Sequence, residues 1–197
     1  FAVTHGFTWD GEATQQADKI VGGHAANVEA SKAATVAEGA RREIAGLGGT
    51  LRPFQEAGVE YARRTQRCFL ADEMGLGKTV ESLAVLQAEH LFPALVVCPA
   101  SVKLNWVKEA VTWLPGKRIT WMDGGAEQFE VKPGGRAPVR CLSNQVTAAD
   151  VVILNYDLLK KWQEVLIARP WKALVIDESH YAKNPKAQRT QYVKSLA

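Results

Sequence analysis

Two short segments of this chain restrict what it can fold into. Residues 70–83 read Leu-Ala-Asp-Glu-Met-Gly-Leu-Gly-Lys-Thr-Val-Glu-Ser-Leu, which joins a glycine-rich turn to residues that favour a helix. Residues 173–180 read Ala-Leu-Val-Ile-Asp-Glu-Ser-His, an apolar run that ends in two carboxylates. Such a continuous apolar run is typical of a strand buried on both faces of a parallel sheet. The carboxylates would then lie at the carboxyl ends of the strands, where open α/β sheets bind ligands.

The glycine-rich turn has the composition of a phosphate-binding loop. Gly75 and Gly77 carry no side chain, so backbone N–H groups can turn toward phosphate oxygens. A helix that begins near Lys78 adds the positive end of its dipole. Lys78 supplies a positive charge for the β- and γ-phosphates, and Thr79 a hydroxyl for magnesium. The strict pattern G-x-x-x-x-G-K-[ST] fails at its first position, where this chain has Asp72, and Gly-x-Gly-Lys strings also occur by chance in loops.

The two carboxylates complement that loop. Asp177 would hold magnesium, usually through water, and Glu178 would orient or polarise the attacking water. An exposed acidic turn after a core strand is the alternative, and on its own it is common. The two segments in this order predict that the chain binds and hydrolyses ATP with Mg²⁺.

These motifs resemble those of the Swi/Snf-type ATPases of helicase superfamily two. Four further segments fall where that family has its motifs: 51–55 (the adenine-recognising Q motif), 97–101 with Asn105 and Trp106 (motif Ia), 153–156 (the next motif on the DNA side) and 183–184. The resemblance covers roughly residues 50–197. Ser179, where the family more often has Ala, resembles the annealing-helicase (HARP-like) branch.

The resemblance implies nucleotide contacts beyond Lys78 and Thr79. Gln55 would read the adenine edge, accepting from N6 and donating to N7, with Arg52 supporting it; a solvated glutamine on a helix is the alternative. The remaining contacts would come from the phosphate loop: Asp72, Glu73, Met74, Gly75, Leu76 and Gly77.

The resemblance also implies contacts with DNA. Ser101 and Lys103, at the start of a helix, would meet a DNA phosphate. The alternative there is an ordinary capped helix, and for Trp106 packing on the core is the favoured interpretation. Asn155 and Tyr156 would touch the DNA backbone, or form a plain turn after their strand. His180 would couple nucleotide to nucleic acid, or serve as a structural histidine.

Composition limits the class of protein without choosing a function. The chain has 197 residues, 47% of them hydrophobic and 23% charged, as is ordinary for a soluble globular protein. No apolar stretch is long enough to span a bilayer, so no membrane association is expected. A net charge of +3 permits binding to nucleic acid but does not argue for it. Cys68, Cys98 and Cys141 form no C-x-x-C pair, which disfavours zinc and suits a prokaryotic or phage cytoplasm or a eukaryotic nucleus.

The chain divides at about residue 49. Residues 1–49 are rich in Ala, Gly and small polar residues and are expected to form an accessory segment or linker, partly helical over 27–45. From residue 50, strands and helices alternate, which predicts an α/β lobe with a mostly parallel sheet and helices on both faces. The expected strands are 68–71, 94–98, 118–122, 151–155 and 172–176, with a hairpin around 133–135.

Residues that commonly cap helices predict where three helices of that lobe begin. Ser101 is expected to cap a helix with Leu104, Val107, Val111 and Leu114 on its buried face. Asp157 would cap a helix that runs to about 168, and Asn184-Pro185 would open the last helix, which reaches 197. A helix is also expected over 79–90, and another from Pro53.

The resemblance implies the first RecA-like lobe of a DNA-dependent ATPase that moves on double-stranded or branched DNA. A second RecA-like lobe in cis would supply an arginine finger, and this lobe alone would hydrolyse ATP hardly at all. Because the chain starts with Phe1, it is expected to be a fragment or a processed chain. One alternative is a strand-separating helicase or restriction-enzyme motor of the same superfamily. The other is a nucleotide-gated DNA-binding module without hydrolysis, against which Glu178 argues.

Overall fold

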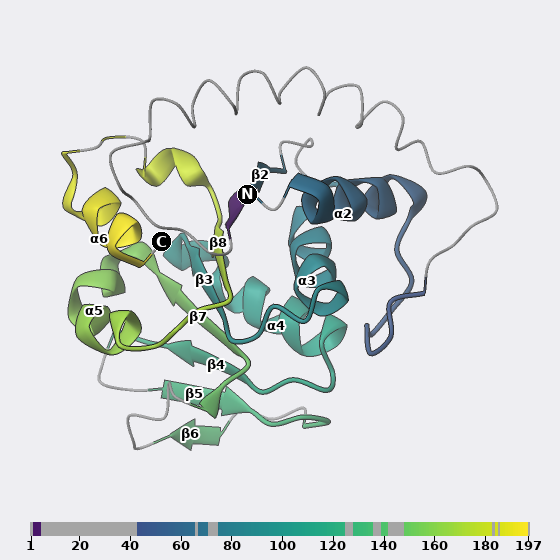
Figure 1. Ribbon diagram of the computed structural model, residues 1–197. Helices are drawn as coiled ribbons and strands as arrows, with labels where there is room; N and C mark the ends of the chain where they lie inside the picture. The colour runs from purple at the N-terminus through teal and green to yellow at the C-terminus, as the bar shows by residue number, and fades with distance from the viewer. Residues whose placement is uncertain are drawn as a thin grey trace.

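The computed structural model describes residues 2–4, 43–65, 67–70, 75–124, 128–135, 139–141, 148–182, 184 and 186–196 (Figure 1). Its centre is an eight-stranded sheet with the order β2-β1-β8-β3-β7-β4-β5-β6. The strands are β1 (Ala2–Thr4), β2 (Cys68–Phe69), β3 (Ala94–Cys98), β4 (Ile119–Met122), β5 (Gln128–Val131), β6 (Val139–Cys141), β7 (Val151–Asn155) and β8 (Ala173–Ile176).

The middle of the sheet is parallel. β3 pairs in parallel with β7 and β8, and β4 pairs in parallel with β7. The two outer parts are antiparallel: β5 and β6 form the hairpin expected around 133–135, and β1 lies between β2 and β8. Since Cys98 pairs with Asn155 and Val97 with Ile176, the carboxyl ends of β3, β7 and β8 meet at one edge.

Five helices among the described residues cover the two faces of the sheet (Figure 1). They are α2 (Pro53–Thr65), α3 (Lys78–Ala88), α4 (Lys103–Trp113), α5 (Leu159–Ile167) and α6 (Gln188–Leu196). Alternate residues of β3 point to opposite faces: Val96 packs with α2, α3 and α4, whereas Leu95 packs with α5 and α6. The arrangement confirms the predicted fold class, a largely parallel sheet with helices on both faces.

The predicted helix starts are wrong at three places. α4 begins at Lys103 after a 3-10 turn, Ala100–Val102, and Ser101 makes no capping bond. α5 begins at Leu159 after the 3-10 turn Tyr156–Leu158, so Asp157 does not cap it. α6 begins only at Gln188, because Asn184 Oδ1 accepts the Lys186 N–H (3.0 Å) in a turn that precedes the helix.

The buried face of α4 also differs from the prediction. Leu104 is 64% exposed, whereas Trp106, Val107 and Ala110 are buried. The large indole of Trp106 occupies the centre of the face, which turns Leu104 toward solvent. The expected helix over 27–45 falls mainly outside the described residues, and its described end, 43–45, is not helical.

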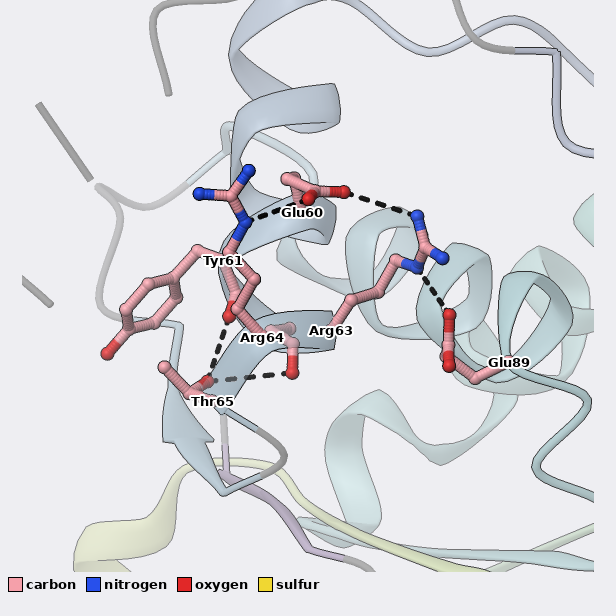
Figure 2. Close-up of polar contacts among 7 residues, drawn as sticks. Glu60, Tyr61, Arg63, Arg64, Thr65 and Glu89 are labelled. Atoms are coloured by element: carbon pink, nitrogen blue, oxygen red, sulfur yellow. Dashed lines mark hydrogen bonds and ion pairs between the residues drawn. The ribbon is translucent and has the colours of Figure 1, made fainter. Parts of the chain in front are cut away.

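A set of ion pairs fixes α2 against the end of α3. Arg63 pairs with Glu60 (3.2 Å) and with Glu89, just beyond α3, and Arg64 pairs with Glu60 at 2.8 Å (Figure 2). Arg63 therefore links α2 to the residue that follows α3. Residues 43–49 pack nearby, since Gln87 donates to the Ala45 carbonyl (2.8 Å). No helix in the described part of the chain is long and apolar enough to cross a membrane.

Candidate active site

The phosphate loop and the two carboxylates meet at the carboxyl edge of the sheet. α3 follows the loop directly, and Asp177 and Glu178 follow β8. Between them lies a hollow of about 370 Å³, called the active-site hollow below. It is lined by Gly75, Gly77, Lys78, Thr79, Val80, Val102, Asn105, Trp106, Glu109, Asp177 and Glu178.

The described part of the phosphate loop needs glycine for two reasons. Gly75 and Gly77 have φ angles of 87° and 90°, in the left-handed region that L side chains avoid. A Cβ at Gly77 would also lie 2.5 Å from Gln55 Nε2. Gly77 leads directly into α3, which begins at Lys78. Asp72, Glu73 and Met74, which the sequence also assigns to the nucleotide, lie outside the described residues.

Gln55 supports the phosphate loop. Its side chain is buried; Oε1 accepts the Arg52 N–H (3.0 Å) and Nε2 donates to the Leu76 carbonyl (3.1 Å). The sequence did not indicate this link, whose partners are 21 residues apart. A glutamine amide has two N–H donors and two lone pairs on oxygen, so hydrogen-bonding capacity is left for an adenine edge. The adenine contacts of Gln55 and Arg52 stay predictions.

Both backbone polar groups of Asp177, the N–H and the carbonyl, form hydrogen bonds. The residue is 6% exposed, its N–H donates to the Val97 carbonyl (2.9 Å), and its own carbonyl accepts the Tyr156 hydroxyl (2.6 Å). The indole N–H of Trp106 donates to its Oδ2 (2.8 Å). Burial raises the pKa of Asp177, the Trp106 bond works against that rise, and the charge of Glu178 adds to it.

Glu178 is exposed and its backbone is strained. Its φ of 50° is uncommon for a residue other than glycine, and such conformations gather at functional sites. The strained turn carries the carboxylate out of the sheet edge, where water can reach it. His180 Nδ1 lies 3.1 Å from Glu178 Oε2, and both side chains are about half exposed. The coupling role of His180 stays a prediction, and this contact gives it a neighbour.

Three of the four residues predicted to contact DNA are buried, and their DNA contacts stay predictions. Lys103 is 7% exposed, and its Nζ donates to Met122 O (2.9 Å), Asp123 Oδ1 (3.0 Å) and Asn155 Oδ1 (3.5 Å). Asn155 is buried with it, and Tyr156 is 4% exposed. The ends of β4 and β7 are neighbours under the first turn of α4, so these side chains meet each other. Ser101 alone of the four is exposed.

Burial also affects the thiol at this edge. Cys98 ends β3 beneath the site, and burial raises the pKa of its thiol to about 12. Cys68 is buried too, so both cysteines behave as small apolar core residues. The described residues contain no group of three or more His, Cys, Asp or Glu placed to hold a metal. Mg²⁺ does not need such a group, because it usually takes one or two carboxylates together with phosphate oxygens and waters.

Comparison with known proteins decides the family. A sequence model of the SNF2-related domain matches residues 54–197. The chain belongs to the SNF2-related domain family. Helicase swr-1 of Neurospora crassa is 37% identical over 155 residues, which covers 74% of this chain and 8% of that protein. The SWI/SNF-related matrix-associated actin-dependent regulator of chromatin subfamily A-like protein 1 of Xenopus tropicalis is 37% identical over 152 residues, covering 76% of this chain and 14% of that protein.

A solved structure gives the same result. The Sulfolobus solfataricus SWI2/SNF2 ATPase core in complex with dsDNA is 28% identical, with a TM-score of 0.62, and the match covers 80% of this chain and 32% of that one. This SNF2-related domain therefore has the RecA-like fold of that core. It spans 8% and 14% of the two relatives named above. Relatives with different names match at 34–38% identity, so the branch indicated by Ser179 stays a prediction.

Proposed function

We propose that this SNF2-related domain is the ATP- and Mg²⁺-binding first lobe of a DNA-dependent ATPase that moves along double-stranded DNA. One observation carries the proposal. A single hollow has Lys78 and Thr79 on one side and Asp177 and Glu178 on the other. A cation and a hydroxyl at a helix N-terminus suit phosphates, and two carboxylates suit a metal and an attacking water.

Each residue has a separate task. Lys78 stabilises negative charge on the β- and γ-phosphates, and the N-terminus of α3 adds its dipole. Thr79 and Asp177 would hold the magnesium ion. Glu178 orients the water that attacks the γ-phosphate, and its exposed position gives that water access. A magnesium ion held there would neutralise negative charge on the phosphates.

Two observations support a DNA partner. The Sulfolobus solfataricus core named above is in complex with dsDNA, and Ser101, one of the four residues predicted to contact DNA, is exposed. We propose double-stranded or branched DNA as the partner, with a second RecA-like lobe in cis that supplies an arginine to the γ-phosphate. The protein would then work where DNA is, in a nucleus or a prokaryotic cytoplasm.

ATP turnover of the full-length protein tests this function. We expect turnover to rise with double-stranded DNA and much less with single-stranded DNA. Stronger stimulation by single strands would support a strand-separating motor instead. Tight, DNA-modulated nucleotide binding without turnover would make the protein a nucleotide-gated binding module, and the proposal would be wrong.

A further inference from the structure

The indole of Trp106 reaches from α4 to the carboxylate at the end of β8. Its Nε1–H donates to Asp177 Oδ2 at 2.8 Å, across 71 residues of sequence. Trp106 is 1% exposed and belongs to the core packed by α2, α3 and α4, yet it also lines the active-site hollow. A buried indole N–H needs an acceptor, and the acceptor that Trp106 meets is the carboxylate that faces the active-site hollow.

We propose that Trp106 is a positioning residue for magnesium, because its indole N–H fixes the orientation of the Asp177 carboxylate. This inference rests on the proposed function, in which Asp177 would hold the magnesium ion. The indole N–H binds Asp177 Oδ2, and because the carboxylate is planar this also fixes the direction of Oδ1. Outer partners of metal-binding carboxylates commonly act in this way, and losing one costs about 10–100-fold in metal affinity.

The backbone of Asp177 does not depend on Trp106. Its N–H is held by Val97 and its carbonyl by Tyr156, so the main chain stays in place when the indole donor is lost. Loss of the indole bond then removes one of the restraints on the orientation of the carboxylate, while the Glu178 backbone remains beside it. The defect should therefore fall on magnesium and spare the phosphate contacts of Lys78, which approach from α3.

A neutral donor suits this position. A lysine or arginine at the same place would hold the carboxylate more strongly, but its charge would repel a magnesium ion nearby. The buried cation of the same helix, Lys103, is directed elsewhere, to Asp123 and Asn155. The indole N–H has no charge and a single fixed direction. It can orient the carboxylate without competing with the ion.

The test compares Trp106→Phe with Trp171→Phe in the full-length protein. Trp171 also donates its indole N–H, to the Leu166 carbonyl (2.7 Å), but it lies at the amino end of β8, opposite to Asp177. ATP affinity is measured by calorimetry with Mg²⁺ and with EDTA. In Trp106→Phe we expect the gain in affinity from Mg²⁺ to fall about 10-fold and the affinity in EDTA to stay unchanged. Trp171→Phe should keep the full gain.

The outcomes separate this inference from the proposed function. If the wild-type protein gains no ATP affinity from Mg²⁺, the proposed function itself is wrong. If the wild-type protein gains it and Trp106→Phe keeps the whole gain, Trp106 is only a core residue. Should Trp106→Phe fail to fold, Trp106→3-benzothienylalanine decides, since sulfur replaces the N–H while the ring keeps its shape. The same loss of Mg²⁺ gain is expected there, and a full gain would overturn the inference.

Discussion

Two halves of the same sheet edge use their motif residues in opposite ways. Beside β2 and β8, Lys78, Thr79 and Glu178 line a hollow that is open to solvent. Beside β4 and β7, Lys103 and Asn155 are buried and bond to each other. A polar residue that follows a strand can therefore be buried in the protein and need not contact a ligand. Residues beside β4 and β7 can instead stabilise the residues that line the hollow. Tyr156 does so by donating its hydroxyl to the Asp177 carbonyl.

The largest effect is expected on the open half, from Lys78→Ala. Turnover in the full-length protein should fall to background and ATP binding should weaken, because Lys78 is the cation of the helix start that faces the phosphates. Lys160→Ala, on an exposed position of α5, is the control and should leave turnover unchanged. Turnover near wild type in Lys78→Ala would remove this residue from the site.

Glu178→Gln should separate binding from chemistry. The substitution keeps the shape of the side chain and removes the carboxylate that orients water, so turnover should fall about 10²–10⁴-fold. ATP and Mg²⁺ affinities, measured by calorimetry, should stay at the wild-type level. A parallel loss of binding and turnover would show that Glu178 is a structural or metal-binding residue.

Substitution of a buried residue beside β4 and β7 should lower the stability of the fold. Lys103→Met keeps the apolar stem but leaves the Met122 carbonyl and the Asn155 amide oxygen without their donor. We expect the free energy of unfolding to fall by about 1–3 kcal/mol in denaturant titrations. Lys108→Met, exposed on the same helix, should change it by less than about 0.5 kcal/mol. Equal stabilities, with weaker DNA binding in Lys103→Met, would restore Lys103 as a DNA contact.

The smallest effect is expected from Ser101→Ala. Ser101 is the exposed member of the predicted DNA contacts, and one neutral hydrogen bond to a phosphate contributes little. Affinity for double-stranded DNA should fall about 2- to 10-fold, similarly for all sequences, without loss of stability. Unchanged affinity would leave this half of the edge with no predicted side-chain contact to DNA.

The sequence predicted the parallel strands best. The predicted β3 (Ala94–Cys98) and β7 (Val151–Asn155) match the structure residue for residue, because each is an apolar run with a clear end: Pro99 follows β3, and the polar Asn155 closes β7. Helix starts were missed at Ser101, Asp157 and Asn184 for a common reason. These side chains favour turns as well as caps, and in each case the chain makes a turn before the helix begins.

The sequence predicted those parts of the site whose positions follow from the sheet topology alone. Parallel strands with right-handed crossovers bring the phosphate loop and Asp177-Glu178 to one edge, whatever the details of packing. The burial of Lys103, Asn155 and Tyr156 depends on β4 and β7 being neighbours, which no local pattern reports. The same holds for Trp106, whose packing was predicted but whose bond to Asp177 joins distant segments.

ATP turnover of the 197-residue chain, measured beside the full-length protein with and without double-stranded DNA, tests whether this domain supplies one half of a two-lobed ATPase site. An arginine supplied from across a cleft is worth about 10³–10⁵ in rate, so the chain alone should turn over ATP at least about 10³-fold more slowly and without DNA stimulation. Robust DNA-stimulated turnover from these residues alone would contradict the account.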